Sequence, residues 1–212
     1  MSQSILRSRR SAVAALALLS LGGVVAAQQA PQSYDHAPVP RFLVGSYGFS
    51  MAQTCARTPF MAPPATGIDP ATKQMLVNGE FVSGYGNGTL KFNRDGTVAM
   101  ENALITEITA SQVSAGQTPV SAGTQFGCQG TYQVQADGKL TVRLVCETVP
   151  PAAGLRVLIQ PIEFEGFVSN GGRAINLGTY KRDIHTVTVY SGTTPVQQRQ
   201  RICLQSLNLD RR

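Results

Sequence analysis

The sequence predicts an all-β fold: a single antiparallel up-and-down barrel of about eight to ten short strands, with a β-sandwich as the alternative. Three observations support this prediction. Apolar and polar residues alternate in many short segments, glycine-containing turns separate these segments, and two of the turns contain the pair Asp-Gly. A long open sheet would leave bare edges, so a run of hairpins favours closure into a barrel.

The first 27 residues have the pattern of a cleavable signal peptide. Arg7, Arg9 and Arg10 precede an apolar run that begins at Ala12, and small residues lead up to Ala27. The apolar run is shorter than the roughly 20 residues that span a bilayer as a helix, so we expect cleavage rather than a membrane anchor. The mature chain is then expected to be periplasmic or secreted, with no integral membrane segment.

Charge and composition describe the rest of the chain. Residues 28–40 are rich in Gln, Pro and Ala without periodicity, and we expect a flexible lead-in before one β-barrel domain at residues 41–212. The formal charge of +6 includes the three signal arginines, so the mature chain carries +3. Its basic residues are scattered, which does not favour a nucleic-acid partner.

The turn at Asp137-Gly138 allows the strand register to be predicted. A two-residue loop would place apolar Val134 opposite polar Thr141. A three-residue loop, with Gly138 in the left-handed conformation, instead places Val134 opposite Leu140 and keeps one apolar face along the hairpin. Further pairs in this register are Tyr132 with Val142, Gly130 with Leu144 and, around the turn at Asp95-Gly96, Phe92 with Val98 and Leu90 with Met100.

The four cysteines all lie in the mature region, and an even number in an exported chain predicts two disulfides. Four cysteines can form two disulfides in three ways, and their spacing in the sequence does not choose among these pairings. The hairpin register brings Cys128 opposite Cys146 at a non-hydrogen-bonded position, where antiparallel strands approach most closely. We therefore predict a Cys128–Cys146 bridge, which leaves Cys55 to pair with Cys203.

Strands that run up and down place their connections alternately at the two ends of a barrel. We expect short turns at 94–96, 136–138 and 169–172 at one end, and longer connections at 110–125 and 150–154 at the other. The run G-Y-G-N-G at 84–88 is interpreted as a tight strand connection. The Pro-rich loop at 53–73 is expected at the tight end, where it could act as a lid or plug. Residues 99–108 could form a strand or, by composition, a helix.

The sequence contains few residues or motifs that are typical of a catalytic site. It contains no G-x-S-x-G elbow, H-E-x-x-H motif or phosphate loop, its cysteine spacings are not those of a metal site, and no cofactor is expected. His36 lies in the lead-in, and His185 begins an alternating strand, where a surface or packed role is favoured over that of a base. Glu163 and Glu165 share one strand face opposite apolar neighbours, so we expect both to point to water.

Aromatic residues on the apolar faces are the candidate ligand contacts. They are Tyr47, Phe49, Phe92, Tyr132 and, less centrally, Phe164. A plain packed core is the competing interpretation of this face. Barrels with this number of strands can nevertheless hold one small ligand.

Three segments carry a resemblance to known proteins: G-S-Y-G-F-S-M at 45–51, F-N-R-D-G-T-V at 92–98 and C-Q-G-T-Y-Q-V-Q-A-D-G at 128–138. They resemble uncharacterised exported bacterial β-barrel proteins in which a G-S-Y-x-F strand is followed by D-G hairpins and a G-T-Y strand. More distantly, the chain looks like calycin or allene-oxide-cyclase-type barrels. The resemblance implies a barrel and transfers no catalytic residue.

We therefore expect an exported β-barrel protein that binds a small, largely apolar molecule inside the barrel. One alternative is an enzyme of the cyclase or isomerase kind, in which a shaped cavity replaces a nucleophile. Another is a structural or surface protein with a filled core and no ligand. An outer-membrane barrel is a further alternative, because alternation alone does not say which face is wet, although the short strands weigh against it.

Overall fold

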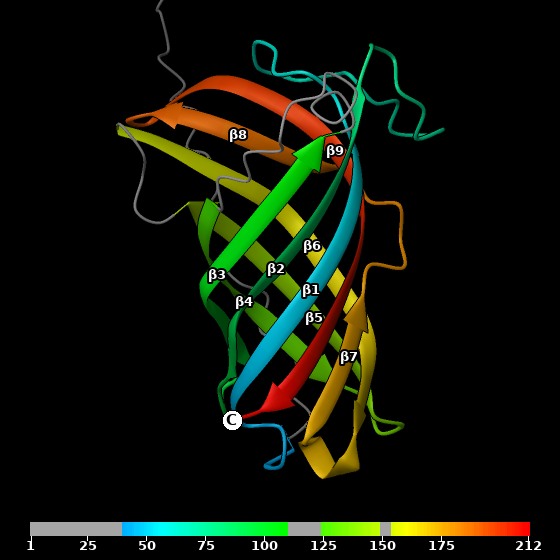
Figure 1. Ribbon diagram of the computed structural model, residues 1–212, viewed down its shortest axis with the longest axis vertical. Coiled ribbons are helices and arrows are strands. Elements are labelled where there is room, and N and C mark those ends of the chain that lie inside the picture. The colour runs from blue at the N-terminus through cyan, green and yellow to red at the C-terminus, as the bar shows by residue number, and fades with distance from the viewer. Residues whose placement is uncertain (1–39, 110–123, 149–153) are drawn as a thin grey trace, which may run out of the picture. The chain divides into compact units, whose positions relative to one another are not determined.

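The computed structural model describes residues 40–109, 124–148 and 154–212, which form an antiparallel β-barrel (Figure 1). Its nine strands are β1 (Gly45–Arg57), β2 (Glu80–Phe92), β3 (Thr97–Thr109), β4 (Thr124–Val134), β5 (Lys139–Thr148), β6 (Leu155–Ser169), β7 (Ala174–Gly178), β8 (His185–Ser191) and β9 (Thr194–Arg211). A short 3-10 turn, η2 (Asn170–Gly172), precedes β7. The predicted signal peptide and nearly all of the predicted lead-in lie outside the described residues.

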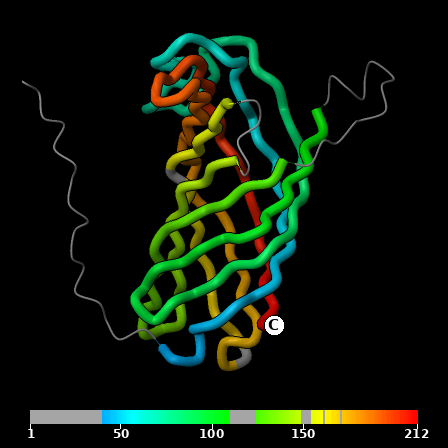
Figure 2. Tube along the Cα trace, turned by 90° about the vertical axis from the view of Figure 1, so that its left-hand side faces the viewer, coloured from blue at the N-terminus to red at the C-terminus, as the bar shows by residue number. Residues whose placement is uncertain are grey.

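The sheet closes because its last strand pairs with its first. Each strand from β1 to β6 pairs with the next, and β9 pairs with β1 from Tyr47 to Arg57. β7 and β8 share one place between β6 and β9, so eight positions surround the interior. Figure 2 shows the strands crossing the barrel obliquely, as closure requires. The predicted up-and-down barrel is confirmed, and the closing β1–β9 pairing rules out a sandwich.

The two ends of the barrel differ. The tight end, lower in Figure 1, contains the turns at 93–96, 135–138 and 170–173 together with the start of β1 and the end of β9. This confirms the prediction for the short turns. The opposite end, where β1 ends and β2 begins, is called the mouth. The predicted connections at 110–125 and 150–154 fall almost entirely outside the described residues.

The glycine-rich segment at 84–88 lies inside β2, so its interpretation as a strand connection is wrong. Gly84, Gly86 and Gly88 face the interior opposite three large side chains of β1. A Cβ atom on Gly88 would lie 2.7 Å from Cε1 of Phe49, because the phenyl ring lies across the glycine. Alternate glycines here make room for a neighbouring strand's side chains rather than for a turn.

Because residues 84–88 form no connection, the loop that precedes β2 lies at the opposite end of the barrel from the one predicted. The loop between β1 and β2, residues 58–79, lies at the mouth, so its predicted place at the tight end is wrong. The loop continues the pairing of β1 with β9, since Met61 forms a bridge with Gln198. The backbone N–H of Ala65 also donates to Oε1 of Gln198 at 3.1 Å. Residues 99–108, whose composition also allowed a helix, lie within strand β3.

The interior has an apolar half and a polar half. The apolar half lies toward the tight end and is filled by buried side chains that include Leu43, Tyr47, Leu90, Phe92, Tyr132, Leu140, Val142, Phe164, Ile175, Leu207 and Leu209. The polar half lies toward the mouth and contains Gln53, Arg57, Glu107, His185, Arg201 and Gln205. The alternation that the sequence shows therefore turns its apolar face inward.

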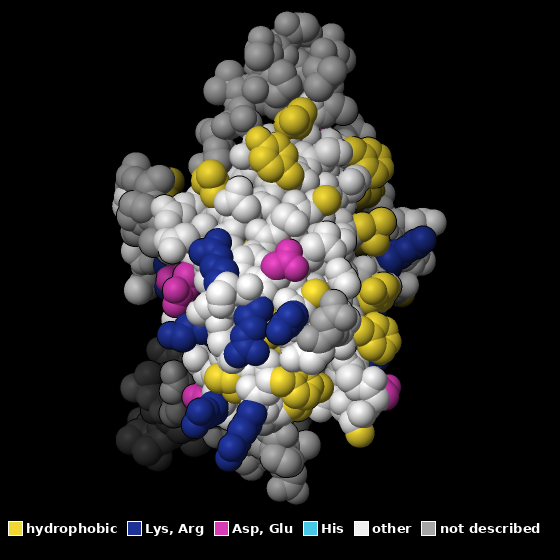
Figure 3. All heavy atoms as spheres, turned by 60° about the horizontal axis from the view of Figure 1, so that its bottom comes forward, with side chains coloured by type: hydrophobic (Ala, Val, Ile, Leu, Met, Phe, Trp, Pro, Cys, Tyr) yellow, Lys and Arg dark blue, Asp and Glu magenta, His cyan; other side chains and the backbone are white. Residues whose placement is uncertain are grey.

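The outer face is mixed in character. Glu163 and Glu165 lie on it, as predicted, and their carboxylates pair with Lys181 at 2.8 Å and Lys139 at 3.1 Å. Figure 3 shows Lys and Arg side chains spread over the tight-end side, with a few Asp and Glu side chains among them. Within the described ranges, no helix has the length and apolar character needed to cross a bilayer.

Both predicted disulfides are present. The sulfur atoms of Cys55 and Cys203 are 2.10 Å apart, and those of Cys128 and Cys146 are 2.06 Å apart. Each bridge joins residues that are directly opposite in the register. The first bridge lies on the seam where β9 meets β1, whereas the second lies within a single hairpin.

We predict that the seam disulfide contributes more stability than the hairpin disulfide. The bridges span sequence separations of 148 and 18 residues, for which the chain-entropy relation gives about 5 and about 3 kcal/mol. Urea unfolding of the paired variants Cys55→Ser/Cys203→Ser and Cys128→Ser/Cys146→Ser measures the difference. A larger loss in the hairpin variant would contradict this account of the closure.

We also predict that Gly88→Val lowers the free energy of unfolding by about 1 to 3 kcal/mol, because the added side chain must displace the ring of Phe49. Ser83→Val is the matched control, since residue 83 is exposed on the same strand and valine favours strands. Urea unfolding compares the two. Equal stability of the two variants would show that the glycine does not hold space for Phe49.

Candidate functional site

A cavity of about 270 Å³ opens at the mouth of the barrel. Its apolar lining residues are Phe60, Ile105, Phe126, Val157, Ile159 and Val187, and its polar ones are Gln53, Glu107, Thr124, Thr148, Arg199 and Arg201. Phe60 belongs to the loop at 58–79, and the others come from seven of the nine strands. Closure of the sheet therefore brings together side chains that are distant in sequence. The volume lies just below the range of about 300 to 1,000 Å³ that is typical of small-molecule pockets.

The cavity has an apolar floor. A second space of about 20 Å³ shares Ile105, Phe126 and Ile159 with the mouth cavity and is otherwise lined mainly by buried apolar residues. Arg201 borders both spaces, and Gln205 borders the lower one. The lining of the site thus changes with depth, from charged side chains at the mouth to apolar side chains farther inside the barrel.

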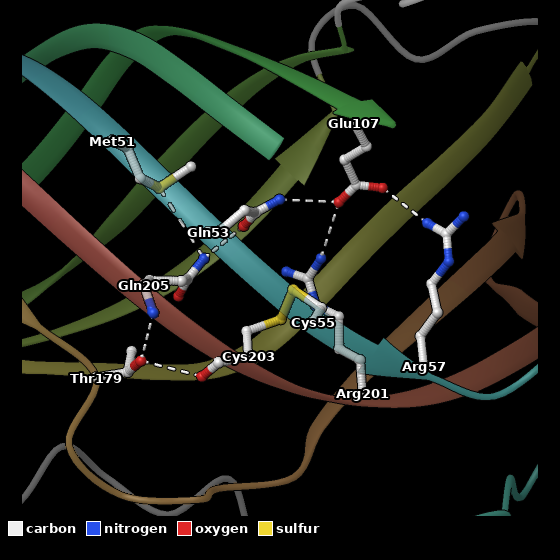
Figure 4. Close-up of a disulfide and its surroundings, with 9 residues drawn as sticks. All are labelled: Met51, Gln53, Cys55, Arg57, Glu107, Thr179, Arg201, Cys203 and Gln205. Carbon is white, nitrogen blue, oxygen red and sulfur yellow. Dashed lines mark hydrogen bonds and ion pairs between the residues drawn. A yellow bond between two sulfur atoms is a disulfide. The ribbon is translucent and has the colours of Figure 1, made fainter. Parts of the chain in front are cut away.

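Three charged side chains form the centre of the polar half (Figure 4). Arg57 contacts two carboxylates: its Nε lies 2.7 Å from Oε1 of Glu80, and its Nη1 lies 2.7 Å from Oε2 of Glu107. Nη1 of Arg201 lies 3.6 Å from the other oxygen of Glu107. Glu107 therefore bridges two arginines, which stand opposite each other on β1 and β9.

A chain of side-chain amides orients Glu107 from below. Nε2 of Gln205 donates to Oε1 of Gln53 at 2.8 Å, and Nε2 of Gln53 donates to Oε1 of Glu107 at 2.9 Å. Gln53 reaches Glu107 across β2 at Gly84, where a Cβ atom would lie 3.1 Å from Nε2 of Gln53. The glycine therefore allows a contact between β1 and β3, two strands that are not neighbours.

Several buried polar atoms in this half have no hydrogen-bond partner among the described residues. They are Nε of Arg199, Nε of Arg201, Nδ1 of His185 and Oε1 of Gln205. Burial lowers the pKa of Arg199 to about 10, and the nearby charge of Arg57 adds to this effect. Burial also lowers the pKa of Arg201. The two arginines are thus cations in a desolvated environment, which disfavours a positive charge that has no counterion.

His185 faces the interior beside Arg201, its partner across the β8–β9 ladder. Its side chain is 2% exposed, which confirms a packed role. Burial, with a smaller contribution from the positive charge of Arg201, lowers the pKa of His185 to about 4. The imidazole is therefore neutral at pH 7.

The aromatic residues predicted as ligand contacts lie in the apolar half. The ring of Phe92 makes edge contacts with Tyr47 and Tyr132, at centroid distances of 5.5 and 4.9 Å. The two tyrosine hydroxyls donate to backbone carbonyls at the tight end, that of Tyr47 to Gly172 at 2.8 Å and that of Tyr132 to Asn93 at 2.5 Å. Phe49 is also buried. These residues do not line the mouth cavity, and a role for them in ligand binding stays a prediction.

Arg199 and Arg201 are site residues that are absent from the candidates predicted from the sequence. Their segment is R-Q-R-I-C-L-Q, in which the two arginines alternate with other residues up to Cys203. This alternation indicates which side chains face inward. Cys203 must face its partner across the seam, and residues two and four positions before it share its face of the strand. Because Cys203 points inward, Arg199 and Arg201 on the same face of the strand are expected to point inward too.

A larger groove of about 600 Å³ lies on the outer face around the β3–β4 ladder. The ladder is interrupted there between the pairs Met100–Cys128 and Ala103–Phe126, and Asn102 has a left-handed φ of 53°. Asparagine adopts this conformation more readily than most residues. The unpartnered buried atoms lie in the polar half of the barrel and not on this groove, so the mouth cavity is the stronger candidate site.

Within the described ranges, no group of three or more His, Cys, Asp or Glu side chains is arranged to hold a metal ion. Comparison of the chain with protein-family models, with curated proteins and with solved structures finds no match. The function is therefore inferred from the site itself.

We predict that His185 makes the barrel less stable in acid. Its pKa is about 4 in the folded protein and about 6.5 in an unfolded chain, so the unfolded state binds more protons between these values. Stability from this residue is present above about pH 6.5 and is lost as the pH falls toward 4, by about 3 kcal/mol in total. Urea unfolding from pH 7 to pH 4 should show a shallower loss in His185→Gln than in the original protein. His36→Gln, in the predicted lead-in, is the control and should leave the slope unchanged.

Proposed function

We propose that this protein binds a small organic molecule in the mouth cavity, as an exported binding protein. The observation that carries the proposal is the convergence of an apolar wall and two arginines, Arg199 and Arg201, each with a buried and unpartnered Nε, on one space at the mouth. Ligand pockets typically combine a mainly apolar lining with a few placed polar groups. The proposal places the ligand above the packed aromatic core rather than against Tyr47, Phe92 and Tyr132.

Export is supported by two independent features. The first 27 residues have the order of a secretory signal, and the described cysteines are all bridged. Disulfides persist in oxidising compartments such as the periplasm and the extracellular space. A binding protein in such a compartment meets small molecules that diffuse outside the cytoplasm.

Binding is favoured over acid–base catalysis by the state of the carboxylate in the cavity. Glu107 is the one acidic residue among the described lining residues. Its two oxygens are engaged by Gln53, Arg57 and Arg201. Both carboxylate oxygens are therefore already used in contacts with the protein's own donors, which suits a role in positioning these side chains. A cyclase or isomerase that works by cavity shape alone would use the same space and is a second outcome of the experiment below.

Native mass spectrometry of protein purified from its own host tests the proposal. We expect an additional mass that corresponds to a small molecule. Val157→Trp should abolish it, because an indole at this position fills the cavity. Gln160→Trp, three positions along the same strand on an exposed site, is the matched control and should retain the ligand.

The outcomes separate the alternatives. A retained mass in Val157→Trp would place the ligand elsewhere and overturn the proposed site. An empty original protein, together with no response to a small-molecule library in thermal unfolding, would favour a structural role with a filled core. A bound molecule that is chemically altered during incubation would indicate the cyclase or isomerase alternative.

A further inference from the structure

Positive charge exceeds negative charge in the polar half of the barrel. Three arginines, Arg57, Arg199 and Arg201, face two glutamates, Glu80 and Glu107. Both glutamates are used by Arg57, and Glu107 is shared with Arg201. His185 adds no charge at neutral pH, since its imidazole is neutral. The described residues therefore leave one cationic charge without a counterion at the mouth.

Arg199 carries that surplus charge. It lies within 4 Å of no described carboxylate, and its guanidinium carbon stands 4.4 Å from the centroid of the Phe60 ring. Arg201 is two residues along β9, so the two side chains leave the same face of the strand about 7 Å apart. Both line the mouth cavity. Two cationic groups thus border one space from one strand.

Each of these arginines also has an unused donor. Nε of Arg199 and Nε of Arg201 are buried and have no acceptor among the described residues. A guanidinium presents five N–H donors in a planar fork, which matches the two oxygens of a carboxylate. A buried cation without a counterion is unfavourable, and an anion in the cavity would supply a countercharge to the two guanidinium groups that line it.

The apolar part of the cavity lining selects the rest of the ligand. Phe126, Ile159 and Val187 present apolar surface, and the narrow space beneath them is lined mainly by apolar side chains. A cavity of about 270 Å³ holds on the order of ten non-hydrogen atoms, if each occupies about the 30 Å³ of a water molecule. This is too small for a long acyl chain and fits a compact apolar body.

We propose that the mouth cavity binds a compact organic carboxylate, with its anionic group held by Arg199 and Arg201 and its apolar body against Phe126 and Ile159. This inference rests on the proposed function and specifies its ligand class. Glu107 has a positioning role, because it holds Arg201 and Arg57 in place while leaving Arg199 for the ligand. Amines and other cations are excluded by the same surplus charge.

The test uses three probes of similar size and different charge: phenylacetate, its neutral isostere phenylacetamide, and phenethylammonium. Calorimetric titration of the full mature protein should show phenylacetate binding about ten- to a hundredfold more tightly than phenylacetamide, since hydrogen bonds to charged groups are the stronger ones. Phenethylammonium should not bind. Phenylacetate should also shift the arginine Nε–H resonances in nuclear magnetic resonance spectra.

Substitutions test whether Arg199 causes the higher affinity for phenylacetate than for phenylacetamide. Arg199→Gln should reduce the acid-to-amide ratio to within about threefold, and Arg199→Lys should restore part of it because the charge is kept. Arg143→Gln removes an exposed arginine on the outer face of β5 and should leave the ratio unchanged. Unaltered urea unfolding of the Arg199 variants checks that the barrel is intact.

The outcomes for the two proposals are distinguishable. Equal affinities for phenylacetate and phenylacetamide, both lost in Val157→Trp, would overturn the anion site and leave small-molecule binding in place. No response of the Nε–H resonances to phenylacetate would likewise overturn the anion site. If in addition the protein from its own host carries no small molecule, both proposals fail.

Discussion

The pairing of β9 with β1 closes the barrel and thereby assembles its interior. It converts a row of hairpins into a barrel, and it removes the two bare edges that an open sheet would expose. The same pairing sets Arg201 opposite Arg57 and Gln205 opposite Gln53. Without this seam the polar half of the interior would not exist, because its groups come from opposite ends of the chain. The Cys55–Cys203 bridge lies on the seam and holds its register covalently.

Two rows of residues across the strands build the polar half. One row runs from His185 through Arg201 and Arg57 to Glu80, and the other from Gln205 through Gln53 and Gly84 to Glu107. In the first row two arginines stand side by side, which is unfavourable unless carboxylates lie within reach. Glu80 and Glu107 supply these carboxylates, the second by contact across a glycine. The cationic groups that are left over face a cavity, and this connects the energetics of the barrel with its proposed use.

Glycine has two separate functions in this barrel. Gly138 has a φ of 84° and supplies the left-handed residue of a three-residue turn, as its place after Asp137 indicates. Gly84, Gly86 and Gly88 supply space inside a strand for Gln53, Met51 and Phe49. Both functions follow from the missing side chain, but the second depends on the neighbouring strand. For this reason the glycine pattern at 84–88 predicts a strand connection although the segment is a strand, and it predicts the wrong end of the barrel for the loop between β1 and β2.

Features that depend on residues close to one another in the chain can be predicted without a structure. Alternation showed which residues share a face, and the apolar match around Asp137-Gly138 set the hairpin register that selects the Cys128–Cys146 bridge. Two features appear only in the folded barrel: Arg199 and Arg201 border one cavity with Phe60 and Phe126, and Glu107 contacts Arg57 across an intervening strand. The difference follows from the range of the interactions. A hairpin register depends on local apolar contacts, whereas the site depends on closure of the barrel between strands at the two ends of the chain.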